Sequence, residues 1–273
     1  MIDFGCHPMA DKARVVKLIQ KTKKLEAAEN KPGSILSENK VSGWSLNFPI
    51  KGTCKPSKLC VETCYYAAGM TTWTNSLRKQ LWNYEACVED PVWFAEEVVR
   101  EYDKKIRGKT DFLRWNGGGD LFPQAVEALN YIGENHPDVV IWVVTRIPEM
   151  AVLVGDWPNI YLHFSLDKHS LDRRDRVINL MTYHKAPMLN RIFFSYQTEK
   201  GEMPDIDHLM DNHGVKLFFY DNYKITPLQY PEIAADERKW GAMCPLNVRR
   251  SREESIEGTC NDCRSCFNGH WQT

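Results

Sequence analysis

Seven of the nine cysteines in this 273-residue chain fall in two short groups, and clustered thiols in a reducing compartment typically bind metals. The two groups are Cys54, Cys60 and Cys64, and Cys244, Cys260, Cys263 and Cys266. The other two cysteines stand alone: Cys6 has no assigned role, and Cys87 lies among apolar residues on an expected helix and is predicted to be a small core residue. The sequence therefore predicts two separate metal centres.

The first group has the spacing C-x5-C-x3-C in the segment KGTCKPSKLCVETCYYAAGM. Three thiolates so close together need a soft cation to hold them. Zinc would require a fourth ligand, and no histidine lies nearby in the sequence, which favours an iron–sulfur cluster. A four-iron cluster held by three cysteines leaves one iron open to a small-molecule ligand. A zinc site completed by a distant histidine, or three exposed thiols, are the alternatives.

The second group has the spacing C-x15-C-x2-C-x2-C, which is typical of ferredoxin-like ligation. Four cysteines can close a site completely, either around a second [4Fe-4S] cluster or around structural zinc. The surrounding tail is polar and poor in core residues, so we expect a metal to hold it together. Three arginines between the ligands form a basic loop that we interpret as solvated.

A glycine-rich turn, NGGGD, covers residues 116–120. Gly117, Gly118 and Gly119 permit a positive φ and let a ligand approach the backbone closely. Exposed N–H groups there would meet a carboxylate, and Asp120 would meet an ammonium; an amino acid carries both groups. Turn geometry alone would explain the glycines in isolation, but after a cysteine triplet they indicate a ligand site. Asn116 either faces this pocket or only shapes the turn.

Six short apolar runs alternate with helical segments, which is typical of a buried parallel sheet in an α/β fold. The predicted strands cover residues 42–49, 111–115, 139–146, 160–166, 191–196 and 216–220. A closed barrel needs eight strands, so six predict a partial (β/α)6 barrel. We divide the chain into an N-terminal helical segment (1–41), the partial barrel (42–225) and a cysteine-rich C-terminal metal-binding extension (226–273).

Helices are predicted over residues 11–30, 73–87, 171–183 and 206–212, and from three prolines that open helices at positions 91, 123 and 148. After Pro91 the residues Phe94, Val98, Tyr102 and Ile106 form one apolar stripe. Reactive groups of parallel folds gather at the carboxyl ends of strands. Those ends carry Cys54, the NGGGD turn, Thr145, Arg146, Ser165, Asp167, Lys168, Gln197 and Asp221.

Composition narrows the function classes. The chain is 43% hydrophobic and 26% charged, which supports a packed core. A net charge of -1 argues against a protein that coats nucleic acid, so nucleic acid is not indicated as a partner. We find no secretory signal and no apolar run long enough to cross a membrane, so we expect a cytoplasmic protein. Arg114 and Arg146, in or after strands, either bind an anion or pair with acidic residues.

The cysteine triplet after the first strand, the glycine turn after the second and the six βα units resemble the radical S-adenosylmethionine (radical SAM) superfamily. The stretch Cys64–Tyr65–Tyr66–Ala67 resembles the motif around that family's last cysteine. The layout is also similar to a phage-encoded group of radical-SAM-like proteins, which would place the chain in the host cytoplasm. Here the spacing is longer than the family's C-x3-C-x2-C, Thr63 replaces an aromatic residue, and Asp120 replaces a glutamate.

The resemblance implies a [4Fe-4S] cluster whose open iron binds S-adenosylmethionine, which is cleaved reductively to a radical that acts on a substrate. It also implies a reductant such as flavodoxin or ferredoxin, an auxiliary cluster at the second cysteine group, and a ribose contact at Ser165. Two alternatives remain open. One is a non-catalytic [4Fe-4S] protein for electron transfer, cluster storage or sensing, and the other is a zinc-stabilised binding module.

Overall fold

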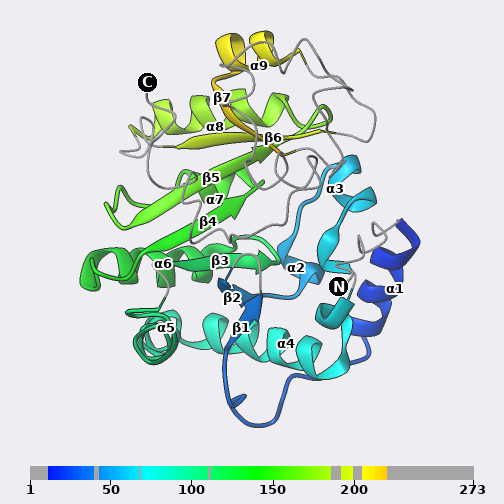
Figure 1. Cartoon of the computed structure of the whole chain (residues 1–273), viewed down its shortest axis with the longest axis vertical. Coiled ribbons are helices and arrows are strands. Elements are labelled where there is room, and N and C mark those ends of the chain that lie inside the picture. The colour runs from blue at the N-terminus through cyan, green and yellow to red at the C-terminus, as the bar shows by residue number, and fades with distance from the viewer. Residues whose placement is uncertain are drawn as a thin grey trace, which may run out of the picture.

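The computed structural model describes residues 12–39, 43–67, 69–109, 112–185, 192–198 and 205–219. These residues form an α/β fold around one mixed, mostly parallel sheet (Figure 1). Its strands lie in chain order: β1 (Leu36–Asn39), β2 (Gly43–Asn47), β3 (Leu113–Gly118), β4 (Ile141–Thr145), β5 (Ile160–Leu166), β6 (Phe193–Gln197) and β7 (Val215–Phe219). Strands β2 to β7 are mutually parallel, and β1 pairs antiparallel with β2.

The six predicted strands correspond to β2 through β7, so the prediction of an α/β fold with a mostly parallel sheet is confirmed. Strand β1 was not predicted, because its sequence LSEN has neither an apolar run nor an alternating pattern. It lies within the expected N-terminal helical segment and extends the sheet by pairing Leu36 with Leu46. Closure of the strands into a partial barrel is not shown by the described residues.

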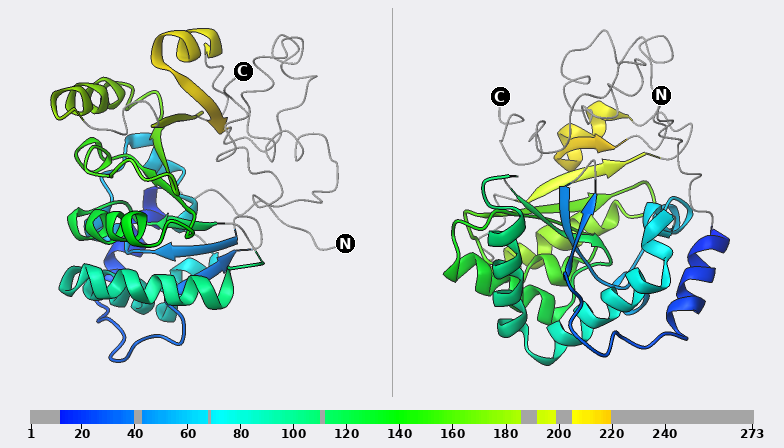
Figure 2. Two further views of the ribbon diagram at one scale, coloured as in Figure 1. Left: turned by 90° about the vertical axis from the view of Figure 1, so that its left-hand side faces the viewer. Right: turned by 60° about the horizontal axis from the view of Figure 1, so that its bottom comes forward.

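The helices α4 to α8 stand on one side of the strands (Figure 2). The helical elements are α1 (Lys12–Thr22), α2 (Ile50–Thr53), α3 (Lys58–Glu62), η1 (Tyr65–Ala67), η2 (Gly69–Thr72), α4 (Thr74–Glu89), α5 (Pro91–Lys105), α6 (Pro123–Asn135), α7 (Pro148–Ala151), α8 (Asp172–Tyr183) and α9 (Ile206–His213). Each predicted helix is present, although α1 ends at Thr22, well before residue 30. No helix among the described residues is both long and apolar enough to cross a bilayer.

Helix α5 begins at the residues, and buries the side chains, that its sequence predicts. Its N-cap Asp90 accepts a hydrogen bond from the backbone N–H of Trp93 at 2.9 Å, and Pro91 occupies the first turn. The predicted apolar stripe is confirmed, because all four of its members are buried: Phe94, Val98, Tyr102 and Ile106.

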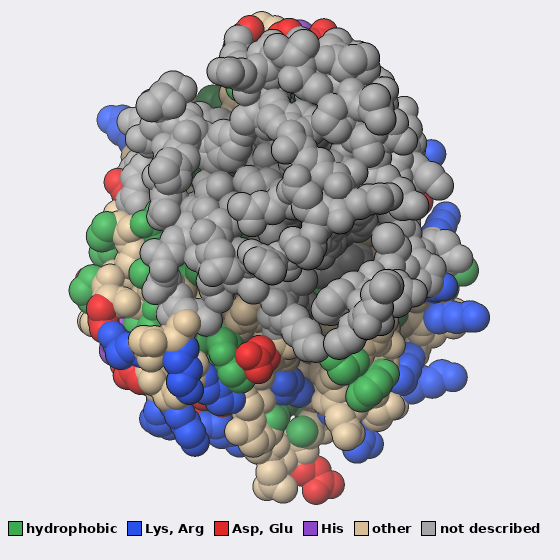
Figure 3. Space-filling view, viewed as in Figure 1, with side chains coloured by type: hydrophobic (Ala, Val, Ile, Leu, Met, Phe, Trp, Pro, Cys, Tyr) green, Lys and Arg blue, Asp and Glu red, His purple; other side chains and the backbone are tan. Residues whose placement is uncertain are grey.

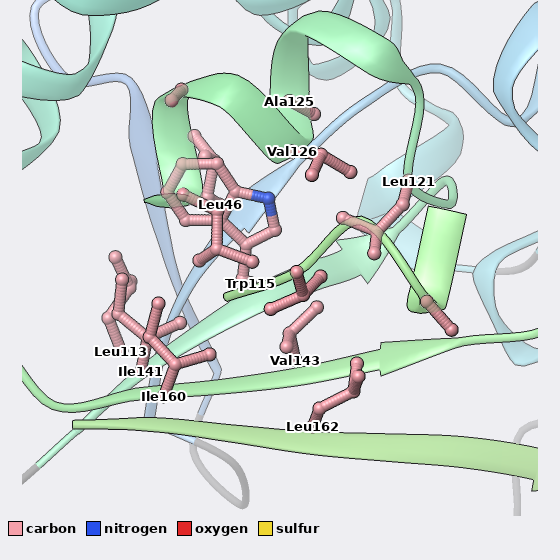
Figure 4. Close-up of a cluster of buried hydrophobic side chains, with 14 of the residues drawn as sticks. Leu46, Leu113, Trp115, Leu121, Ala125, Val126, Ile141, Val143, Ile160 and Leu162 are labelled. Carbon is pink, nitrogen blue, oxygen red and sulfur yellow. The ribbon is translucent and has the colours of Figure 1, made fainter. Parts of the chain in front are cut away.

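The main hydrophobic core lies between the sheet and the helices (Figure 4). Successive strands contribute side chains of the same face, among them Leu46, Trp115, Val143 and Leu162. Cys87 is fully buried in this core, as predicted for a structural cysteine.

The opposite face of the strands is aromatic and polar. The Arg114 guanidinium lies over the Trp142 ring at 5.0 Å, and the His163 ring stands edge-on to Trp142 and stacks on Phe193 with centroids 4.5 Å apart. His163 is therefore a packed strand residue.

Glu101 on α5 fixes the start of the sheet. Its carboxylate accepts hydrogen bonds from Ser34 Oγ at 2.6 Å and from the Ile35 N–H at 2.8 Å, and it pairs with Lys105 at 2.9 Å. Burial acts to raise the pKa of Glu101, but these partners outweigh it and lower the pKa. Since the folded state holds the charged form, this stabilisation is complete above the ordinary glutamate pKa and is lost as pH falls through the lowered value.

Replacing Glu101 by glutamine is therefore expected to lower the free energy of unfolding at pH 7 by roughly 2 kcal/mol, the range for hydrogen bonds to charged groups. The difference between the variant and the parent protein should begin to shrink near the ordinary glutamate pKa of about 4.3 and disappear as pH falls through the lowered pKa. Urea unfolding at several pH values measures both effects, and a difference that does not change with pH would contradict this assignment.

Candidate functional site

The three cysteines of the first group lie in a loop at the carboxyl edge of the sheet, directly after β2. Cys54 follows α2, Cys60 lies in α3, and Cys64 precedes η1. Helix α1 packs against α2, α3 and η1, beside α3 in Figure 1. Val15 and Leu18 of α1 contribute to a second small core that Cys64 joins. The loop is thus held between α1 and the sheet.

The three thiols are neighbours in space. Burial raises the pKa of Cys54, and the negative charges of Asp120, Cys60 and Cys64 raise it further. Burial also raises the pKa of Cys60 and of Cys64; nearby Arg146 counteracts this at Cys60, and backbone N–H groups do so at Cys64. Bare thiols in these surroundings stay protonated at neutral pH, and a bound cation would supply the positive charge that thiolates need.

Two kinds of metal centre were predicted for the three thiols. In the described part of the chain, no group of three or more His, Cys, Asp or Glu side chains is arranged to hold a metal ion. A single zinc ion draws its ligands into contact with one atom, whereas a four-iron cluster is larger and keeps its cysteines further apart. The three thiols are partly buried, and no histidine lies near them in the sequence to complete a zinc site, so the four-iron cluster stays the favoured prediction.

A buried ion pair ties this loop to two neighbouring strands. Arg146, which follows β4, donates from Nη1 to Asp167 Oδ2 after β5 at 2.5 Å. Asp167 also accepts the hydroxyl hydrogen bond of Ser57, the N-cap of α3, whose Oγ in turn accepts from the Cys60 N–H at 3.1 Å. Burial acts to raise the pKa of Asp167, but Arg146 and Ser57 hold it below its ordinary value. For Arg146, pairing with an acidic residue is therefore the alternative that the structure shows.

Three further hydrogen bonds complete this attachment. Arg146 Nη2 donates to Gln197 Oε1 at 2.9 Å, and Gln197 Nε2 donates to Thr63 Oγ1 at 3.0 Å. Arg173 of α8 donates to the backbone carbonyl of Lys55 at 2.8 Å. The loop that carries the cysteines is consequently fixed by the ends of β4, β5 and β6 and by α8.

The glycine turn lies against the same loop. The Tyr66 ring packs over Gly118, where a Cβ would clash with the ring carbons. A Cβ at Gly117 would meet Asn47 and Ser45, and Gly119 has a φ of +83°. The chain's own packing therefore requires these glycines, and their predicted contact with a ligand stays a prediction.

Asp120 links the turn to the neighbouring strand. Its carboxylate is buried and accepts hydrogen bonds from Thr145 Oγ1 at 2.6 Å, from the Leu121 N–H at 2.8 Å and from the Arg146 N–H at 3.2 Å. Its own N–H donates to Thr53 Oγ1 at 3.1 Å, one residue before Cys54. Burial raises the pKa of Asp120 to about 6. The carboxylate predicted to meet an ammonium thus has three partners within the protein.

Asn116, unlike Asp120, has a buried side chain whose polar atoms have no partner among the described residues. It lies in a bulge of β3, since Leu46 pairs with Trp115 but Asn47 pairs with Gly118, and it has a φ of 60°. Its side chain is buried, and neither amide atom has a hydrogen-bond partner among the described residues. An unpaired buried amide in a strained backbone costs free energy, and such residues cluster at ligand sites.

Ser165 lies buried on β5, two residues before Asp167 and opposite Ser195 of β6. It is not part of the hydrogen-bond network that fixes the loop, so its predicted ribose contact stays a prediction. Sequence reasoning missed Ser57 and Thr53, and it named Tyr66 only as part of the stretch that begins at Cys64. Only Ser57 left a signal, because a serine three residues before Cys60 fits an N-cap that accepts from that N–H.

Replacing Gly118 by alanine is expected to push the Tyr66 ring away and to destabilise the fold by about 1–3 kcal/mol, the usual cost of overpacking. Gly33→Ala is the matched control, because a Cβ there meets nothing within 4 Å. Urea unfolding of the two variants checks this expectation. Equal midpoints would show that Tyr66 does not rest on Gly118.

A family model described as gene product 88 matches residues 16–269, which include both cysteine groups and the glycine turn. The chain belongs to the gene product 88 family. No curated protein and no solved structure matches it. Within this family match, the second cysteine group lies outside the described residues: Cys244, Cys260, Cys263 and Cys266. Its metal site therefore remains a prediction from spacing.

Proposed function

We propose that this member of the gene product 88 family is an iron–sulfur protein of radical-SAM-like architecture, with a [4Fe-4S] cluster held by Cys54, Cys60 and Cys64. The observation that carries the proposal is the convergence of three partly buried thiols at the carboxyl edge of parallel strands, against the glycine turn. We further propose that the six parallel strands form a partial barrel around the site.

We infer that the open iron binds S-adenosylmethionine. When bound, the cluster would supply an electron for reductive cleavage of this ligand and so start radical chemistry on a substrate. The protein's part is to position and enclose the ligand. The unpartnered amide of Asn116 is suited to hold a polar group of it, since the amide offers both a donor and an acceptor. Gly119 and the neighbouring backbone would lie beside the ligand's amino acid end.

The second candidate is a [4Fe-4S] protein that does not use S-adenosylmethionine. One observation favours it: Asp120, the expected partner of the ligand's ammonium, already accepts three hydrogen bonds from the protein. Such a protein would carry electrons, store a cluster or sense its state. The zinc-stabilised module is the weaker proposal, because no histidine lies near Cys54, Cys60 and Cys64 in the sequence to complete a tetrahedral zinc site.

The test is anaerobic purification with iron, sulfide and zinc analysis, followed by EPR of the reduced protein with and without S-adenosylmethionine. A [4Fe-4S] signal that the ligand perturbs, with release of 5′-deoxyadenosine, would support the enzyme. An unchanged signal would favour the second candidate. Zinc without iron would overturn both.

An Asn116→Ala variant sharpens this test. We expect it to keep its iron but to bind S-adenosylmethionine at least about tenfold more weakly, because one good polar contact is worth about 1.4 kcal/mol. Asn130→Ala is the control: the Asn130 amide on α6 bonds to Leu153 and Gly155 after α7, away from the cysteine loop, so this variant should bind the ligand normally.

A further inference from the structure

One side of the molecule carries a dense group of lysines. Residues 12–24 contain five exposed lysines and no acidic residue, and the cysteine loop adds three more exposed lysines. The eight are Lys12, Lys17, Lys21, Lys23, Lys24, Lys51, Lys55 and Lys58. Residues 50–67 contain a single acid, Glu62. Figure 3 shows basic side chains along its right-hand edge, on the side where α1 lies in Figure 1. We call these eight residues the lysine face.

The lysine face lies over the cysteine loop. Helix α1 packs on α2, α3 and η1, and its buried side joins the small core that includes Cys64. Lys55 and Lys58 stand between Cys54 and Cys60 in the sequence. The positive charge of the lysine face is therefore carried by the cysteine loop and by the helix packed on it, and it would attract an acidic partner to this side of the molecule.

Exposed apolar side chains border the lysine face. Met70 of η2 and Trp73 before α4 are 66% and 62% exposed. Lys21 joins them to α1, because its Nζ donates to the Thr72 carbonyl at 2.7 Å. Methionine and aromatic residues are enriched at protein interfaces, and charged residues around them steer the encounter.

We propose that the lysine face, with Met70 and Trp73, docks an acidic protein that carries one electron and reduces the cluster. This inference rests on the proposed cluster at Cys54, Cys60 and Cys64. One electron leaves the carrier, which is oxidised by one, and the cluster is reduced by one; no bond forms or breaks. Electron-transfer encounters are small and transient, which suits a charged surface with a limited apolar centre.

Nucleic acid is the rival occupant, and two observations disfavour it. The face consists of lysines, which act as point charges, whereas arginine provides the bidentate contacts with phosphates and bases. The whole chain has a net charge of -1, so the positive charge is local rather than general.

The test reverses three lysines of α1 and the residues after it, Lys17→Glu, Lys23→Glu and Lys24→Glu, in one full-length variant. The matched control carries Lys104→Glu, Lys109→Glu and Lys185→Glu. These three residues are exposed and precede β3 or β6, so they lie at the opposite edge of the sheet with the same change in charge. The probe is a plant-type ferredoxin. Calorimetry measures its binding, and stopped-flow absorbance measures the rate at which its reduced form reduces the cluster.

At low salt we expect the lysine-face variant to bind ferredoxin at least about tenfold more weakly than the parent protein. We also expect reduced ferredoxin to reduce the cluster of this variant at least about tenfold more slowly. The control should match the parent, and about 1 M salt should bring the parent down to the variant's rate. Equal behaviour of all three proteins would overturn the proposal. So would tight, lysine-dependent binding of a single-stranded oligonucleotide without ferredoxin binding.

Dithionite separates this inference from the proposed function, because a small reductant needs no docking surface. One outcome is that dithionite reduces a cluster in all three proteins while ferredoxin binds and reduces all three equally well. In that case only the proposed docking surface is wrong. If the parent protein contains no cluster, the proposed function is wrong. Calorimetry then still decides whether the lysine face binds an acidic carrier.

Discussion

A Cys60→Ala variant, purified without oxygen, is expected to lose the first cluster completely, so that its iron and sulfide fall by the content of one four-iron centre. Two remaining thiols cannot compensate, because a four-iron cluster is held by cysteine thiolates and two of them would leave two irons without a protein ligand. The reduced protein should also lose the EPR signal that responds to S-adenosylmethionine. Any iron that remains would belong to the C-terminal cysteine group.

Cys87→Ala is the matched control for this prediction. Cys87 is as buried as any residue in the core but lies apart from the cysteine loop, on α4. We expect the control to keep all its iron and to lose about 1 kcal/mol of stability. If Cys60→Ala retained as much iron as the parent protein, the cluster would not be bound at this loop.

The strands β2 to β7 were predictable because they lie in short, largely apolar segments bounded by turn residues, which is the pattern typical of a buried parallel sheet. Strand β1 was not predictable, because LSEN forms a strand through its pairing with β2 and through the hydrogen bonds of Glu101 to the preceding turn. Its stability comes from partners distant in sequence. The short elements α2, α3 and η1 are too brief for any periodicity to reveal them.

The site was predictable in outline for a similar reason. Parallel strands bring their carboxyl ends to one edge, so the cysteine loop and the glycine turn had to lie close together. Which side chains join them was not predictable. That Tyr66 covers Gly118, and that Asp120 turns into the protein, depends on the exact register of β3 and its bulge at Asn116. The metal itself remains inferred from the thiols and their spacing.

Removing one half of the Arg146–Asp167 pair is expected to have the second large effect. Arg146→Ala leaves the Asp167 carboxylate buried without its main partner, which typically costs about 3–5 kcal/mol. The change also removes the positive charge that lowers the pKa of Cys60, so that thiolate becomes harder to form. We therefore expect both a lower free energy of unfolding, measured in urea, and weaker retention of iron against a chelator.

The control is Arg107→Ala, which breaks ion pairs with Asp103 and Asp138 at the surface. Exposed pairs are screened by water, so stability and iron content should hardly change.

The double variant Arg146→Met with Asp167→Leu separates structure from electrostatics. Replacing both charges by apolar groups should recover much of the lost stability. It should not recover iron retention, because Cys60 still lacks its neighbouring positive charge and Ser57 has lost the carboxylate that anchors α3. A double variant that regained both would show that Arg146 acts on the fold alone.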